Sequence, residues 1–288
     1  MTSPLVASIV HGPEDGASPL VFDSPHSGMV WPPDFETCAS RASILSTWDA
    51  WVDDLWSGAR SIGAPLVAAH FPRAYIDANR ARTDLDEAIV EHGWPEPLEP
   101  TAYCQRGMGL IRRLALPDEP MYTTRLTHAA VKHRITAYYQ PYRDAVASLL
   151  DRAAERHGVA CLVDCHSMKS RGNRMNVDSG AARPDVVVSD REGTTADPAL
   201  TAWLAAFLSE RGYLVQVNDP YKGGDLVRTF GHPDRRRHAV QVEINRACYM
   251  DETAVVRNEG FERVRADLTA LVVALDHHVR DTMRVSPA

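Results

Sequence analysis

The chain has 288 residues, of which 44% are hydrophobic and 24% are charged. These proportions are ordinary for a globular protein, and the length allows one large domain or two small ones. The formal net charge of −7 argues against a protein that binds nucleic acids through their phosphates. No apolar run is long enough to cross a membrane, and residues 1–15 lack a basic segment followed by an apolar one. We therefore expect a cytoplasmic protein with neither nucleic-acid nor membrane partners.

Apolar, β-rich runs alternate with helical patterns along the chain. The predicted strands are 19–24, 65–71, 160–165, 185–190, 213–218 and 238–245. The predicted helices are 41–62, 125–157, 198–211 and 252–283. Several of the apolar runs are continuous, which is typical of strands covered on both faces. Strands that alternate with helices predict an α/β fold with a largely parallel or mixed sheet. We expect a single domain that spans residues 1–288.

Two segments interrupt this alternation. Residues 81–124 have weak periodicity and several prolines, and residues 168–184 form a second stretch without a clear pattern. Long loops in compact domains are often functional. We interpret 81–124 as a long excursion over the active-site edge of the sheet, and 168–184 as a second loop of the same kind.

Two histidines follow apolar strands in similar contexts. His26 lies in LVFDSPHSG and His166 lies in LVDCHSM. Ligands of open α/β sheets bind beyond the carboxyl ends of the strands, so we expect both imidazoles at one edge of the sheet. Two imidazoles suit a divalent transition metal such as zinc, whose catalytic sites have three protein ligands and one open position.

A carboxylate on the first predicted helix is the third ligand that we expect. We choose Asp49, with Asp53 or Asp54 as alternatives. Asp49 and Asp53 would share one face of a helix, so that one can bind the metal while the other orients a neighbour. Simpler interpretations stay open: the histidines can be structural, Asp49 can be a solvated helix residue, and Asp23 and Asp164 can cap loops.

The strand HAVQVEIN places a carboxylate inside the predicted sheet. Alternation along this strand puts Glu243 on the face opposite to Val242 and Ile244. A buried carboxylate is costly unless it is paired or used. As a general base beside a metal, Glu243 would take a proton from water. A structural ion pair with Arg246 or another arginine fits the same pattern.

Arginines next to apolar residues and glycines indicate an anionic substrate. RAYIDANRAR contains Arg73 and Arg80, and DLVRTF contains Arg228. A guanidinium group holds a carboxylate with two parallel hydrogen bonds, so several arginines near a metal suit a substrate with more than one carboxylate. We interpret Arg82 and the run 235–237 as solvated surface residues.

A thiol nucleophile is an alternative to metal chemistry, because Cys165 precedes His166. Neighbouring side chains of a strand point to opposite faces, so these two would not form a nucleophile–base pair. We expect Cys165 to be buried as a small apolar residue. The five cysteines are odd in number and show no CxxC spacing, which indicates reduced thiols.

Six motifs in a fixed order give the chain a family resemblance. They are SPHSG, DAWVDDL, RAYIDANR, DCHSM, KGGDLVRTFGHP and HAVQVEINRACYM, within residues 20–255. Together they resemble the N-formylglutamate amidohydrolase (N-formylglutamate deformylase) family. The resemblance implies a zinc-dependent hydrolase with a three-layer α/β/α sandwich around a mixed sheet, related to the zinc carboxypeptidases. The implied reaction converts N-formyl-L-glutamate and water to formate and L-glutamate, in histidine degradation.

The resemblance also implies roles for individual positions. His26 and His166 match the metal-binding histidines, and Glu243 matches the strand carboxylate that acts as general base in carboxypeptidase-like enzymes. The motifs expected to line the substrate pocket contribute Arg73, Asn79, Arg80 and Arg228. Two positions depart from the pattern: Met29 stands where the carboxypeptidase relatives have Glu, and Arg143 stands where this family has His, so that Arg143 can tune a different substrate.

The partner that we expect is a small N-acyl amino acid with carboxylates. The same chemistry on another N-acyl amino acid or a small peptide is one alternative. A non-catalytic ligand-binding protein on a hydrolase scaffold is another, although the presence of both histidines and Glu243 argues against it. His and carboxylate ligands also accept iron, cobalt or manganese in place of zinc.

Overall fold

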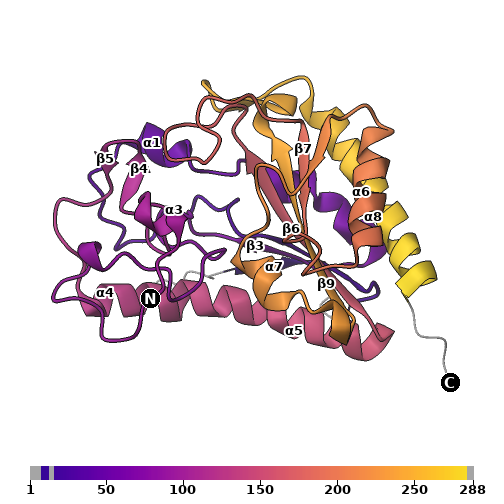
Figure 1. Ribbon diagram of the computed structural model, residues 1–288, viewed down its shortest axis with the longest axis horizontal. Helices are drawn as coiled ribbons and strands as arrows, with labels where there is room; N and C mark the ends of the chain where they lie inside the picture. The colour runs from indigo at the N-terminus through magenta and orange to yellow at the C-terminus, as the bar shows by residue number, and fades with distance from the viewer. Residues whose placement is uncertain (1–7, 13–15, 284–288) are drawn as a thin grey trace.

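Seven strands hydrogen-bond into one sheet in the order β1-β3-β2-β6-β9-β7-β8 (Figure 1). The computed structural model describes residues 8–12 and 16–283. The strands of this sheet are β1 (Ser8–His11), β2 (Leu20–Ser24), β3 (Leu66–Ala69), β6 (Ala160–Met168), β7 (Val186–Ser189), β8 (Val215–Val217) and β9 (Arg237–Asn245). Strands β3, β2, β6 and β9 are parallel, whereas β1 and β7 are antiparallel to β3 and β9. The mixed sheet is therefore as predicted, with β1 as a further strand.

Helices cover both faces of the sheet. Val21 and Leu162 face α5 and α7, whereas Phe22 and Val163 face α2, α6 and α8. Figure 1 shows α5 along one side of the sheet and α6 with α8 on the other. The three-layer α/β/α arrangement is thus confirmed. The helices are α2 (Val52–Leu55), α4 (His128–Arg134), α5 (Gln140–His157), α6 (Pro198–Ser209), α7 (Asp225–Phe230) and α8 (Phe261–Met283), with a π-helical turn at Ile135–Tyr139 between α4 and α5.

The connections contain shorter elements. These are α1 (Arg41–Leu45), α3 (Ala102–Gln105), the pairs β4 (Leu114–Leu116) with β5 (Glu119–Pro120) and β10 (Met250–Asp251) with β11 (Val256–Arg257), and 3-10 turns at Ser57–Ile62, Glu87–Ile89, Pro233–Arg235 and Arg246–Cys248. Residues 81–124 hold α3, β4 and β5 and lie beside the sheet edge (Figure 1). Among the described residues, no helix is both long and apolar enough to cross a membrane.

Two predicted helices are wrong in their extent. Residues 41–62 form α1, α2 and a 3-10 turn instead of one helix, because Trp51 has a left-handed backbone with a φ of 56°. At this break the N–H of Asp49 donates to the carbonyl of His26 at 3.2 Å, which fixes Asp49 beside the strand end. The helix predicted from residue 252 begins only at Phe261, because the β10–β11 pair occupies the preceding residues.

Strand pairing brings the candidate residues to one edge of the sheet. Strands β2 and β6 are parallel neighbours with Asp23 opposite Asp164, so His26, which follows the end of β2, lies near His166. Strand β6 continues to Met168, so His166 lies within it and not after it as predicted. Strands β6 and β9 are parallel neighbours with His166 opposite Glu243. After β2 the chain passes very close to the end of β3, and a Cβ atom added to Gly28 would lie 2.2 Å from the carbonyl carbon of His70.

This close approach predicts that Gly28→Ala destabilises the fold. The added methyl group overlaps backbone atoms that cannot rotate away. Overpacking of this kind costs about 1–3 kcal/mol, and we expect the free energy of unfolding to fall by about 3 kcal/mol. The same shift displaces His26 and weakens metal binding. Urea denaturation and a metal titration measure both effects. Gly180→Ala is the comparison for a loss of stability without displacement of His26: its φ of 79° also disfavours a side chain, but its added Cβ would meet no atom within 4 Å. Its metal affinity should stay at the wild-type level, and unchanged metal affinity in Gly28→Ala would contradict the prediction.

Candidate metal centre and substrate pocket

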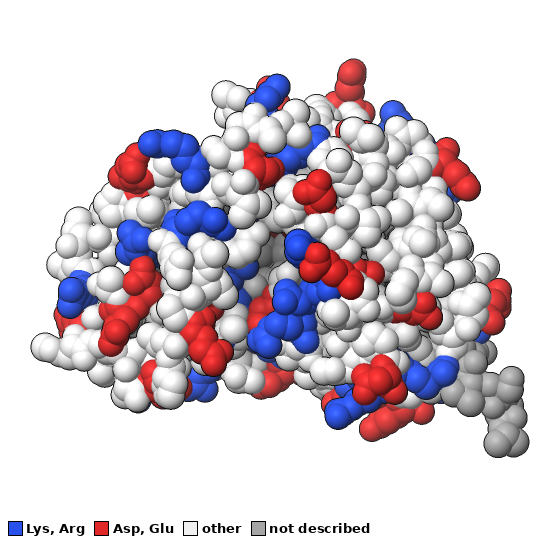
Figure 2. Space-filling view, in the orientation of Figure 1, with Lys and Arg blue, Asp and Glu red and all other residues white. Residues whose placement is uncertain are grey.

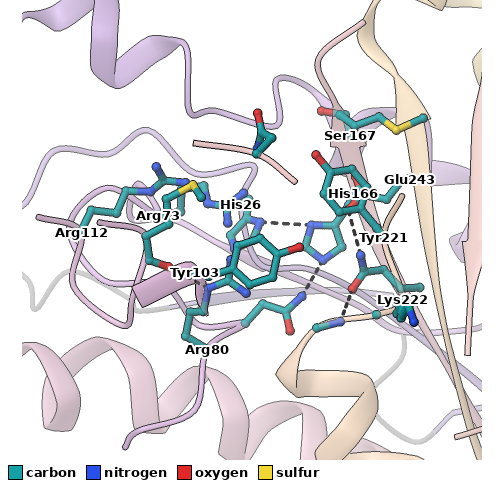
Figure 3. Close-up of a pocket in the computed structure, with 17 residues that line it drawn as sticks. His26, Arg73, Arg80, Tyr103, Arg112, His166, Ser167, Tyr221, Lys222 and Glu243 are labelled. Atoms are coloured by element: carbon teal, nitrogen blue, oxygen red, sulfur yellow. Dashed lines mark hydrogen bonds between the residues drawn. The ribbon is translucent and has the colours of Figure 1, made fainter. Parts of the chain in front are cut away.

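Three buried donor atoms converge at the end of β2 and β6. The Nδ1 atoms of His26 and His166 lie 3.1 Å apart, and the Oδ2 atom of Asp49 lies 3.4 Å and 3.1 Å from them. All three side chains are buried, and Figure 3 shows the two imidazoles facing each other across the cavity. The structure therefore brings together the three residues that the sequence predicts as metal ligands.

Buried carboxylates hold the far side of each imidazole. The Nε2 atom of His26 lies 2.7 Å from Asp77 Oδ1, and the Nε2 atom of His166 lies 2.6 Å from Asp164 Oδ1. Asp77 forms a hydrogen bond with the ring of His26, and Asp164 forms an ion-pair contact with the ring of His166, so the Nδ1 atoms are the ones directed toward Asp49. Carboxylates that orient metal-binding imidazoles in this way are a common feature of zinc sites.

The donor set fits a divalent metal in both chemistry and spacing. Zinc–nitrogen bonds of 2.0–2.1 Å in a tetrahedron place neighbouring ligand atoms roughly 3.4 Å apart. The three distances here are 3.1, 3.1 and 3.4 Å. Two lone pairs and a carboxylate at this spacing repel one another unless a cation lies between them. Burial would lower the pKa of His166, but the charge of Asp164 and the hydrogen bonds of Asp164 and Asp49 raise it well above its ordinary value, so a metal bound to His166 would displace a proton.

Asp49 is held by its own set of donors. Arg246 donates from Nη2 to Asp49 Oδ1 at 2.9 Å, and the backbone N–H of Ser167 donates to Asp49 Oδ2 at 3.3 Å. Burial opposes ionisation, but the hydrogen bonds of the two histidines and the charge of Arg246 hold the pKa of Asp49 well below its ordinary value. The alternatives Asp53 and Asp54 lie outside the cluster, and Asp54 bonds Arg257 at the surface.

Glu243 faces the same cavity from β9. Gln241 donates from Nε2 to Glu243 Oε1 at 2.8 Å, and Gln241 in turn accepts the N–H of Gly224 at 2.7 Å. The ion pair with Arg246 that would have made Glu243 structural is absent, since Arg246 bonds Asp49. Burial raises the pKa of Glu243 above its ordinary value, and the nearby charge of His166 opposes this shift. Glu243 is thus a buried carboxylate beside the metal cluster, and a raised pKa suits a proton acceptor near neutral pH.

The cavity beside the cluster has a volume of about 130 Å³. Its wall includes Arg73, Asn79 and Arg80, three of the four residues predicted to contact substrate. Arg228 lies in a neighbouring groove, is half-exposed and bonds Asp225 at 2.5 Å. Residues 81–124 contribute Tyr103, Met108 and Arg112 to the wall, and residues 168–184 contribute Asn176.

Comparison with known proteins agrees with this geometry. The sequence model of the N-formylglutamate amidohydrolase family matches residues 18–250. The chain belongs to this family. It is 29% identical to the N-formylglutamate deformylase of Pseudomonas aeruginosa over 266 residues, which are 90% of this chain and 93% of the relative. The Pseudomonas putida N-formylglutamate deformylase is 29% identical over 242 residues, 83% of this chain and 84% of the relative.

A solved structure of the family has the same fold. The crystal structure of N-formylglutamate amidohydrolase from Ralstonia eutropha superposes with a TM-score of 0.92 at 39% identity, and the match covers 96% of this chain and 99% of that one. The arrangement of strands around the histidines is therefore an arrangement that this amidohydrolase family uses.

The sequence does not predict the positions of several residues of the site. Asp164 is not a loop cap but the partner of His166, and the Asp-Cys-His spacing on a strand predicts that both share one face. Asp23 is buried and accepts a hydrogen bond from Tyr142 at 2.8 Å. Asp77 lies in a loop, where no periodicity shows which way it points. Gln241, Tyr103, Arg112, Tyr221 and Lys222 also line the cavity without having been predicted there.

Two further expectations concern Arg143 and Cys165. Arg143, where the family pattern has His, bonds Asp225 at 2.9 Å and the carbonyl of Ala78, and it is not among the residues that line the cavity.

The thiol of Cys165 packs in the core on the face of β6 opposite to His166. Burial raises the pKa of Cys165 well above its ordinary value. A buried, protonated thiol that points away from the imidazole is not placed to act as a nucleophile.

We predict that Asp77→Asn and Asp164→Asn weaken metal binding roughly 10- to 100-fold each, because a neutral amide polarises the imidazole less than a carboxylate does. Competition with a chelator of known affinity measures the zinc dissociation constant. Asp54→Asn is the matched control, since Asp54 bonds Arg257 at the surface. Equal zinc affinity in all three variants would show that these carboxylates do not support the cluster.

Proposed function

We propose that the chain hydrolyses the formamide bond of N-formyl-L-glutamate, with a zinc ion held by His26, Asp49 and His166. The observation that carries the proposal is the pair of imidazoles whose outer nitrogens are bound by carboxylates and whose inner nitrogens face Asp49. The names of the Pseudomonas relatives support N-formylglutamate as the substrate. The reaction would release formate and L-glutamate in the cytoplasm, as a step of histidine degradation.

The chain's own residues perform the proton transfers. A divalent metal at this cluster supplies a Lewis acid that makes water a nucleophile near neutral pH. Glu243 takes a proton from the water as its oxygen bonds to the formyl carbon. Glu243 then delivers this proton to the nitrogen of glutamate as the carbon–nitrogen bond breaks. Gln241 holds the carboxylate of Glu243 in place for both transfers.

Positive side chains bind and orient the substrate. Arg80 lines the cavity, donates from Nε to the carbonyl of Met108 at 3.0 Å and stacks on the ring of Tyr103 at 4.4 Å. Its remaining N–H groups are available to a carboxylate. Arg73 is already bound to Asp77 by two hydrogen bonds, so it acts chiefly by holding the carboxylate that orients His26.

Formate release tests the reaction. We expect purified protein to release formate from N-formyl-L-glutamate, to lose this activity on chelation and to regain it with zinc, while the metal content of the same sample changes in step. Bound stoichiometric metal without formate release would keep the metal site and reject the substrate. In that case a panel of other N-acyl amino acids and small peptides is the next assay. Activity that resists chelation would reject the metal.

Replacing the proposed base tests the mechanism. Glu243→Gln keeps the size and the hydrogen bond acceptor of the side chain but cannot take a proton, so we expect kcat to fall roughly 10²- to 10⁴-fold. Zinc content should stay at the wild-type level. Glu262→Gln on the exposed side of α8 is the control for loss of a carboxylate. Wild-type turnover in Glu243→Gln would exclude this residue as the base.

A further inference from the structure

Most of the positive side chains around the candidate site are already bound to carboxylates of the protein. Beside the main cavity lies a second one of about 100 Å³, and the two share Arg73 and Arg112 in their walls. Figure 2 shows Lys and Arg side chains around a hollow near the centre of this face. The paired cations of the two walls are Arg73 with Asp77, Arg246 with Asp49, Arg183 with Asp178 and Lys222 with Glu192.

Arg112 is a buried cation of these walls that is not bound to a carboxylate. Its side chain is 7% exposed, and its Nε atom is buried without a hydrogen-bond partner. Within the described residues, the Arg112 guanidinium forms neither a hydrogen bond nor an ion pair. Burial, together with the neighbouring charge of Arg73, lowers the pKa of Arg112 to about 9. A buried cation without a partner is costly, so a residue of this kind is expected only where it has a use.

The backbone holds Arg112 firmly in this position. The N–H of Asp77 donates to the carbonyl of Leu110 at 2.8 Å, and the N–H of Leu110 donates to the carbonyl of Asp84 at 2.6 Å. Ile111 is fully buried. The segment before Arg112 is therefore attached to the loop that carries Asp77, the partner of His26. Figure 3 shows Arg112 beside Arg73 on the His26 side of the cavity.

Lys169 is a second cation without an ion pair in the second cavity. Lys169 is partly buried and follows β6. The charged groups around it are one carboxylate, that of Glu252, and three guanidinium groups, those of Arg246, Arg112 and Arg183. Burial, with the charge of Arg246, lowers the pKa of Lys169 to about 8. Arg112 and Lys169 are thus neighbouring cations in the wall of one cavity, and neither is paired with a carboxylate in the part of the chain that the structure describes. Such a pair suits the binding of an anion.

We propose that Arg112, together with Lys169, binds one carboxylate of the substrate and thereby determines specificity for acidic N-acyl amino acids. This inference rests on the proposed function for the identity of the substrate. Because Arg112 borders both cavities, a carboxylate bound to it lies beside the metal cluster. Arg80, on the wall of the first cavity, remains for a second carboxylate. A substrate with two carboxylates would thus supply negative charges for Arg112 with Lys169 and for Arg80.

Arg112→Met tests the assignment with a readout that does not depend on turnover. We expect the dissociation constant of glutarate, measured by calorimetry on the metal-loaded protein, to rise roughly 10- to 100-fold when the charged hydrogen bonds are lost. The Tm without ligand should stay the same or rise, because an unpaired buried charge is removed. Arg112→Lys keeps the charge but lacks the planar guanidinium group with its two parallel N–H donors. Its affinity for glutarate should therefore lie between those of the wild type and Arg112→Met.

Arg113→Met is the matched control. Arg113 is the next residue, but it points outward and bonds Asp86 at 2.7 Å. It should bind glutarate as the wild type does. Lys169→Met provides a second variant for the same site, and we expect a rise in its dissociation constant as well.

The outcomes separate this inference from the proposed function. Wild-type protein that does not bind glutarate, or Arg112→Met and Lys169→Met variants that bind it as tightly as the wild type, would overturn the carboxylate site. If glutarate binding depends on Arg112 but the wild type releases no formate from N-formyl-L-glutamate, the proposed reaction fails and the carboxylate site stands. If both hold, KM for N-formyl-L-glutamate should rise in Arg112→Met more than kcat falls.

Discussion

Two imidazole nitrogens face each other across 3.1 Å, and both side chains are almost completely buried. Asp77 and Asp164 contact the Nε2 atom on the opposite side of each ring and so fix the orientation of both imidazoles. In a medium of low dielectric, such an arrangement of donor atoms suits a proton or a metal cation bound between them. The other buried charges of the site can be understood as the support that this arrangement requires.

The support continues outward, because each buried carboxylate needs its own donors. Arg73 donates twice to Asp77, Asn79 donates to Asp164, and Arg246 donates to Asp49. These residues come from four separate parts of the chain. Removing one partner of a buried ion pair leaves an uncompensated charge, so the members of such a network depend on one another. The network thus joins residues of motifs that lie far apart in the sequence.

The sequence predicts the sheet and the histidines for one physical reason. Apolar runs mark buried strands, and parallel strands end at a common edge, so polar residues that follow such runs must meet there. Asp49 was also predicted, although the helix that carries it is broken in the structure. Loop residues such as Asp77 and Arg112 could not be placed, because loops have no periodicity. The position of Arg228 could not be predicted for the same reason: its motif does not show that Asp225 holds it in the neighbouring groove.

Pairing is the property that distinguishes supporting cations from those that can bind substrate. In the sequence, Arg73, Arg80 and Arg112 look alike, and all three line the same cavity. In the structure, Arg73 is bound to Asp77, whereas Arg112 is buried and forms no ion pair with a carboxylate of the described residues. Folding leaves this charge unneutralised, and the backbone connects its segment to the loop that orients His26. An anion that binds Arg112 therefore completes the electrostatics of the site from the same loop that positions a metal ligand.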